Sequence, residues 1–362
     1  MKICVWMLML LAGLMMGSMN VLAQESNVKA KKSSSWEFSG RVQLQHAYNE
    51  EFNLQDDVVK HGFRIRRARI QTKASVNSWL SGKIQVDVRD NSPRLKDAEG
   101  KIKLFNGNYN LRFGQFKIPV WREEFLRSSG DLIMVERSLA SSFLIVNLLS
   151  ARNVGLEFGG KVNEKFSFAI NYNNGAGEGN RELGNSESRV VNDGKMWVGR
   201  VDFNLSKVVK VGVSGAVNQV GQASDSDTTT GNNTLLAPDF GIYLPSGIDI
   251  EGAIATGIID KSFIEQFADK KYTVWNLSGR WKKFYKTALE AWGGLNGFEL
   301  AASATGINSD VSTADESNVY KGGFGLYFGK RMRLQSNFEY HIPVAEGEDN
   351  FTTIRTNFTL NF

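Results

Sequence analysis

The chain has 362 residues, and its 43 lysines and arginines exceed its 38 aspartates and glutamates, for a formal net charge of +5 at pH 7. Beyond residue 23 no stretch approaches 18 consecutive apolar residues, which excludes helical membrane spans. The 36 glycines, 5 prolines and 23 phenylalanines are typical of a chain with many strands and turns.

The N-terminus has the order of features found in an export signal. Lys2 precedes an apolar run of about 14 residues, too short for a helical span, and Val21-Leu22-Ala23 supplies short side chains at a cleavage site. We expect a signal peptide over residues 1–23, with a membrane anchor as the alternative. Cys4 is the only cysteine, so the mature chain contains no disulfide. The polar residues 24–35 are predicted to form a periplasmic tail.

From Trp36 onward the sequence alternates between apolar and polar residues. Trp36 and Phe38 lie on one face of a predicted strand, and Glu37 and Arg41 lie on the other. The same pattern predicts strands at 36–45, 68–76, 80–89, 98–105, 109–117, 154–162, 166–172, 197–205, 209–217, 248–258, 273–281, 285–293, 320–328 and 332–342. Most have the length that a tilted strand needs to cross a bilayer. A soluble β-sandwich or jelly roll is the alternative.

The last residues form the most regular strand. Ile354, Phe358, Leu360 and Phe362 alternate with polar residues up to the final position. A membrane barrel must pair its last strand with its first, because an open edge leaves backbone groups without partners. A terminal strand that ends on Phe362 resembles the assembly signal of bacterial outer-membrane barrels. We therefore expect residues 36–362 to form an all-β transmembrane antiparallel β-barrel.

Several long segments interrupt the strands. Residues 173–195, 221–233 and 308–317 are rich in Gly, Asn, Ser, Thr and Asp, as external loops would be. The segment from Glu123 to Arg152 differs, because it is long and fairly apolar without clean alternation. We expect it to fold inward and narrow the lumen, with Arg127 or Arg137 near the pore axis. The alternative is an external loop that caps a neighbouring subunit.

The polar faces of the strands near the chain ends carry an excess of positive charge. The basic members are Arg41, Arg69, Lys73, Lys83, Arg89, Lys101, Lys103, Arg112, Arg331, Arg333 and Arg355, against the acids Glu37, Asp87, Glu99 and Glu339. Rings of arginine and lysine select anions in pores, and the arginine fork suits phosphate. Alternatively, the charge solvates the wall and acids elsewhere compensate it.

Catalytic and metal-binding signals are weak. His46, His61 and His341 do not occur at a metal-ligand spacing, and the sequence contains neither a G-x-S-x-G elbow nor a Walker loop. We expect no enzymatic activity and no cofactor or metal.

Residues 61–179 resemble the phosphate-selective porin O and P family of Gram-negative outer membranes. The resemblance depends on short motifs in a fixed order, including FRIRRARI at 63–70, LRFGQFKIP at 111–119, VERS at 135–138, ARNVG at 151–155 and NYNNGAG at 171–177. It implies a barrel of about 16 strands, usually trimeric, with an inward constriction loop and basic residues that guide anions.

The resemblance directs attention to particular side chains and partners. The candidate pore-lining, anion-guiding residues are Arg41, Arg66, Arg67, Arg69, Lys73, Lys83, Arg89, Lys101, Lys103, Arg112, Lys117, Arg122, Arg127, Arg137 and Arg152. The expected partners are small anionic solutes, outer-membrane lipid and lipopolysaccharide, the barrel-assembly machinery and two further copies of the chain, but no nucleic acid.

Two features depart from a phosphate-specific channel. The segment 122–152 has four arginines and no lysine, so phosphate need not be favoured over other anions. Arg66, Arg67 and Arg69 could be structural and pair with acids such as Glu123, Glu124 or Glu136. A non-selective diffusion porin and a structural or adhesive barrel are the alternative functions.

Overall fold

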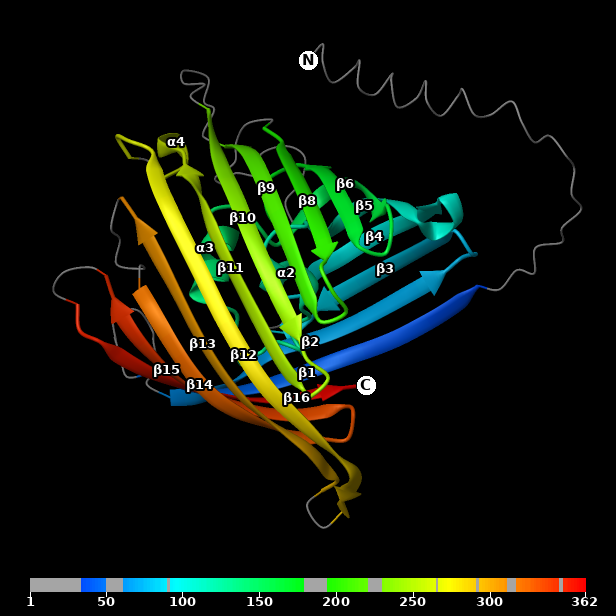
Figure 1. Ribbon diagram of the computed structural model, residues 1–362, viewed down its shortest axis with the longest axis vertical. Helices are drawn as coiled ribbons and strands as arrows, with labels where there is room; N and C mark the ends of the chain where they lie inside the picture. Colours follow the sequence, from blue (N-terminus) through cyan, green and yellow to red (C-terminus); the bar gives the residue numbers. More distant parts are fainter. Residues whose placement is uncertain are drawn as a thin grey trace, which may run out of the picture. The chain divides into compact units, whose positions relative to one another are not determined.

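The computed structural model describes residues 34–49, 61–89, 92–178, 194–220, 230–264, 266–290, 293–310, 317–344 and 348–362. The predicted signal peptide, nearly all of the predicted tail and most of the three predicted polar loops lie outside these residues. Within them, sixteen antiparallel strands form a closed barrel in which each strand pairs with its neighbours in sequence (Figure 1). The predicted fold class is confirmed.

The strands are joined alternately by shorter turns and longer loops, so the barrel has a turn end and a loop end. Their bounds are β1 Ser35–Asn49, β2 His61–Ser75, β3 Leu80–Asp87, β4 Arg94–Leu104, β5 Tyr109–Lys117, β6 Arg152–Lys161, β7 Phe166–Asn173, β8 Met196–Asn204, β9 Val209–Val220, β10 Gly231–Tyr243, β11 Ile248–Ile259, β12 Lys270–Leu289, β13 Leu295–Ser309, β14 Ser317–Phe328, β15 Met332–Pro343 and β16 Phe351–Asn361. The turn after β4 contains the 3-10 helix η3, Phe105–Gly107, and the loop after β11 contains α4, Lys261–Ile264.

The last strand closes the barrel against the first, as the sequence predicts. The register runs from Arg41 opposite Asn361 to Asn49 opposite Thr353, and Figure 1 shows β1 beside β16. Beyond it, the Gly40 N–H donates to the Phe362 carbonyl at 2.7 Å, and the Phe362 N–H donates back at 3.1 Å. A Cβ on Gly40 would lie 2.3 Å from the Phe362 ring, so glycine at this position leaves room for the ring where it lies.

The alternating pattern divides the wall into two faces. Outward side chains such as Trp36, Phe38 and Ile84 are exposed, whereas inward Gln43 and Gln45 are buried. Every backbone N–H and C=O in a bilayer needs a partner, and a closed ladder provides one. No helix in the described part of the chain is both long and apolar enough to span a membrane.

Two strands were missed, and one predicted strand is wrong. The missed strands are β10, which contains Pro238, and β13, which is rich in Ala, Gly and Ser. Proline is rare inside sheets, and the register between β10 and β11 skips positions 237 and 238. The predicted strand at 285–293 is largely the turn-end part of β12, because Lys282–Phe284 continue to pair with β13 instead of forming a turn.

The long segment after β5 packs on the inner wall of the barrel. It contains α2, Arg122–Leu126, and α3, Leu139–Val146. Trp121, Leu144 and Leu149 are fully buried and belong to one hydrophobic cluster with inward residues of β8–β13, such as Met196 and Val274. In Figure 1, α2 and α3 lie behind β10–β13. We call residues 118–151 the inward segment.

Candidate functional site: the barrel lumen

The inward segment enters and leaves the lumen through tight backbone turns. Trp121, Leu148 and Ala151 have φ values of 63°, 57° and 73°, a region that non-glycine residues adopt at a cost. In contrast, α3 begins at a favourable cap, because the Ser138 hydroxyl accepts a hydrogen bond from the Ser141 N–H at 3.1 Å. Tertiary contacts therefore determine the path of the segment.

The tip of the inward segment also reaches inner-wall strands outside β8–β13, on β15 and β1. Arg333 of β15 donates to the Leu132 carbonyl at 3.0 Å, and Gln335 donates to the Ile133 carbonyl at 2.6 Å. On β1, Gln43 donates to the Ser129 carbonyl at 3.3 Å. The segment is thus held at its flanks by apolar packing and at its tip by polar side chains.

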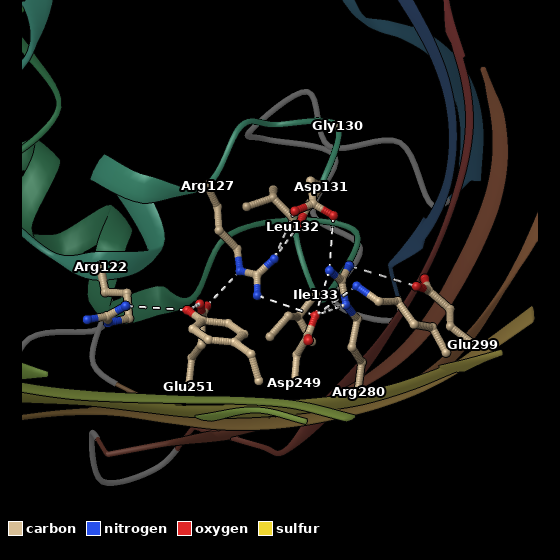
Figure 2. A network of polar contacts seen from close by, with 12 residues as sticks. Arg122, Arg127, Gly130, Asp131, Leu132, Ile133, Asp249, Glu251, Arg280 and Glu299 are labelled. Atoms are coloured by element: carbon tan, nitrogen blue, oxygen red, sulfur yellow. Dashed lines mark hydrogen bonds and ion pairs between the residues drawn. The ribbon is translucent and has the colours of Figure 1, made fainter. Parts of the chain in front are cut away.

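A second set of contacts joins the inward segment to β10–β13 (Figure 2). Arg127 donates to Glu251 at 2.6 Å and pairs with Asp131 at 3.0 Å. Arg280 on β12 pairs with Asp131 at 3.0 Å and with Asp249 at 2.8 Å. We call Arg127, Asp131, Asp249, Glu251 and Arg280 the tip network.

The tip network continues through acids on the two strands that the sequence did not predict. Glu299 on β13 accepts from Arg333 at 3.0 Å. Asp239 on β10 accepts from Arg122 and from Arg200, each at 2.7 Å. The missed strands therefore contribute two buried carboxylates to the lumen, and both neutralise arginines.

The wall formed by β2–β6 also carries ion pairs. Lys83 lies 3.1 Å from Asp97 and 2.9 Å from Glu99. Arg112 lies 2.7 Å from Glu99 and 2.8 Å from Glu157. Acids therefore neutralise many cations of this wall, as the alternative in the sequence analysis allowed.

Exposure nevertheless differs between the two walls. In most ion pairs on β2–β6 the cation is the more exposed partner: the Lys83 side chain is 24% exposed against 6% for Asp97. On β8–β13 and the adjoining tip the order depends on the pair, since Arg280 is 2% exposed against 60% for Asp131 but Lys282 is 29% exposed against 9% for Asp249. The first pattern also has exceptions: Glu178 is more exposed than Lys96 and Arg152, Glu37 is more exposed than Lys73, and Glu136 is more exposed than Arg67.

The predicted arginine cluster on β2 is structural in part. Glu136 of the inward segment pairs with Arg66 at 2.6 Å and with Arg67 at 3.0 Å, which confirms one of the suggested partners. Arg69 pairs instead with Asp87 at 3.0 Å. The other suggested partners lie elsewhere: Glu123 accepts hydrogen bonds from Ser138, and Glu124 pairs with Lys117 and Arg137.

Burial and nearby positive charges have opposite effects on the pKa values of the carboxyl groups in the inward segment. Burial alone would raise the pKa of Glu136, but Arg67 and Arg66 outweigh it and hold this pKa well below its usual range. Glu123 has no such arginine pair, and burial raises the pKa of its carboxyl against the opposing Ser138 hydrogen bonds. Glu136 is therefore a firm anionic tether between the tip and β2.

The remaining candidate residues occupy varied settings. Arg41 donates to Ser129 at 2.9 Å, Arg89 donates to the Arg66 carbonyl at 2.9 Å, and Arg152 donates to Asp97 at 2.6 Å. Lys73 forms an exposed pair with Glu37 at 3.5 Å. Lys101 lines a turn-end pocket with Lys73 and Lys83, and in the described part of the chain neither Lys101 nor Lys103 has an ion-pair partner. Arg122 and Arg127 are buried, and their part in guiding anions stays a prediction.

Among the described residues, no group of three or more His, Cys, Asp or Glu side chains has a geometry suited to a metal ion. The site in this part of the chain is therefore a charged, hydrogen-bonded lumen.

No family model and no curated protein matches the chain, so the resemblance to the phosphate-selective porin O and P family stays a prediction. Solved structures do match. The outer membrane channel DcaP of Acinetobacter baumannii has a TM-score of 0.62 at 11% identity, over 92% of this chain and 99% of that chain. The anion-selective porin from Comamonas acidovorans has a TM-score of 0.58 at 12% identity, over 91% and 100%.

A loop-deletion mutant of OmpT, an outer membrane protein of Vibrio cholerae, has a TM-score of 0.60 at 12% identity, over 91% of this chain and 99% of that chain. At such identities the likeness shows the fold alone. The chain has the sixteen-stranded barrel fold of outer-membrane porins.

Proposed function

We propose that this protein is an outer-membrane porin that lets small solutes diffuse through a water-filled lumen, with a preference for anions. The observation that carries the proposal is the combination of a closed barrel, an apolar exterior and an inner wall lined with charged side chains, on which an inward segment packs. Sealed packing lies against β8–β13, whereas the charged side chains on β2–β6 keep contact with water.

The anion preference rests on which member of each ion pair faces the water. On β2–β6 the exposed groups are the tips of Lys83, Arg112 and Arg69, and their carboxylate partners lie deeper in the wall. A permeating ion responds most strongly to the nearest charges, because the Coulomb interaction weakens with distance and salt screens more distant charges. The unpaired Lys101 and Lys103 add positive potential towards the turn end.

The cellular setting belongs to the same proposal. The charged and apolar start of the sequence supports export with cleavage after Ala23, and the strand ending on Phe362 supports insertion by the barrel-assembly machinery of a Gram-negative bacterium. The exposed apolar belt would contact outer-membrane lipid and lipopolysaccharide. Assembly as a homotrimer is part of the proposal.

Reconstitution tests the channel directly. Purified full-length protein added to a planar lipid bilayer in 1 M KCl is expected to give discrete, long-lived conductance steps, and proteoliposomes are expected to swell in small sugars. If the correctly folded protein gives neither conductance steps nor proteoliposome swelling, the result would contradict the porin proposal and favour a structural or adhesive barrel.

A further inference from the structure

The loop-end half of the lumen contains a pocket of about 390 Å³ between β2, β14–β16 and the inward segment. We infer that this pocket is a binding site for a small organic dianion that carries a charge at each end. The inference deepens the proposed porin function and rests on it, since the ligand would be a permeating solute.

The first observation is a local charge excess. Five cations line the pocket in addition to Arg137, which pairs with Glu124: they are Arg64, Arg66, Arg67, Lys321 and Arg355. Only two carboxylates, Glu136 and Glu339, line it with them. Five positive charges against two negative charges leave three in excess within one cavity, and an anion would lower the energy of that arrangement.

The cations form two groups, each with one carboxylate. On β2, Arg66 and Arg67 share Glu136. Among the described residues, Arg64 beside them donates to the neutral Gln45 side-chain oxygen, at 2.8 Å and 2.5 Å, and to no carboxylate. This group can accept one further anionic oxygen pair, and the planar guanidinium of Arg64 suits a carboxylate.

The second group lies on β14 and β16. Lys321 is 3.5 Å from Glu339, and Arg355 pairs with the same carboxylate. Glu339 is fully buried while the Arg355 side chain is 25% exposed, so the cation faces the cavity in front of its partner. Two cations again share one negative charge, which leaves room for a second anionic end of the ligand.

The size of the pocket limits the ligand. A volume of about 390 Å³ is near the lower end of the range of roughly 300–1,000 Å³ for small-molecule sites. It suits a compact solute, and two groups of cations, each with only one carboxylate, favour a dicarboxylate over a monoanion. Succinate and acetate are therefore the matched probes, because they differ mainly in the second charged end.

Titration calorimetry of detergent-solubilised full chain, combined with channel block in bilayers, tests the inference. We expect saturable succinate binding, one per chain, roughly tenfold or more tighter than acetate, in line with one added charge-assisted interaction. Inorganic phosphate, a dianion with a single centre, should fall between them. Succinate should block the single-channel current over the same concentration range.

Two variants and two controls separate a site from bulk electrostatics. Arg64→Gln and Lys321→Gln remove one charge from each group and should each weaken succinate binding roughly tenfold. Arg331→Gln and Lys165→Gln remove the same charges from exposed turns and should leave it unchanged, because the structure places Arg331, predicted on the inner face, in the turn before β15. Circular dichroism and gel mobility before and after boiling would confirm that each variant is folded.

The outcomes are distinguishable from failure of the porin proposal. Normal conductance with equal affinity for succinate and acetate, or equal losses in variants and controls, would overturn the dianion site alone. Saturable succinate binding without any conductance would keep the site and overturn the channel.

Discussion

The inner walls of β2–β6 and β8–β13 both pair arginine or lysine with carboxylates, but the pairs differ in how far they are exposed to water. On β8–β13 the inward segment covers the pairs, so Arg280 and Glu299 are almost fully buried. On β2–β6 more of the pairs keep contact with water, and in most of them the cation is the more exposed partner, as Lys83 and Asp97 illustrate. The difference shows that net charge along a wall says little until the order of exposure is known.

The largest expected effect concerns the buried side of this comparison. Replacing Arg280 with Met removes one partner from Asp249, which keeps Lys282 and Arg127, so we expect a loss near the lower end of the roughly 3–5 kcal/mol for breaking a buried pair. Replacing exposed Lys73 with Gln should cost about 0–1 kcal/mol, the range for surface pairs. Urea unfolding of both variants in the same detergent measures the contrast, and equal losses would show that the two walls are not energetically distinct.

Removing the inward segment should turn the sealed wall into an open one. We expect a folded barrel in which a Gly-Ser stretch of equal length replaces Arg127–Ser142 to conduct roughly twofold or more better, because the lumen widens. A matched replacement of residues 244–247, a turn at the opposite end of the barrel, should leave conductance unchanged. Wild-type conductance in the segment variant would place the permeation path away from the tip.

Charge reversal on the open wall should alter selectivity. Changing Lys83, Lys101 and Lys103 to Glu is expected to weaken or reverse the anion preference, since these cations face water. Changing exposed Asp131 to Asn should instead strengthen it modestly. Reversal potentials of both variants measure this, and a triple variant with unaltered selectivity would remove β3 and β4 from the permeation path.

The smallest expected effect concerns pH, because the stability that Glu136 contributes should not change between pH 8 and about pH 5. The pKa of Glu136 is depressed in the folded protein, so its stabilising contribution is complete above the ordinary carboxyl pKa of about 4.3 and is lost only as the pH falls through the folded value. The stability difference between wild type and Glu136→Gln should therefore be constant from pH 8 to about pH 5. A difference that shrinks across this interval would mean that Arg66 and Arg67 do not hold the carboxylate as described.

Local patterns predicted the parts of the fold that depend on local chemistry. Alternation in 353–362 predicted the closing strand, and apolar residues in an otherwise polar set of loops predicted the inward course of 123–152. Pro238 and the small residues of β13 hid two strands, because neither local pattern resembles a typical strand. Because those two strands were missed, their acids Asp239 and Glu299 were missed as well. They are the partners of Arg122 and Arg333, which the sequence analysis names.

The sequence could not predict which member of each ion pair in the lumen is the more exposed to water. Arg122 and Asp239 are 117 residues apart and meet only because the inward segment crosses to β10. Strand phase places a charge inside the barrel, but whether its tip reaches water depends on which wall the segment covers.

The reversal potential of the wild-type protein across a KCl gradient of about 0.1 M to 1 M is the most direct test of the central claim. We expect a potential of the sign given by chloride passing faster than potassium, and this preference should shrink when both sides are raised to higher salt, where the Debye length falls towards about 3 Å. A potential of the opposite sign in folded, conducting protein would contradict the account, because the exposed cations of β2–β6 would then not control permeation.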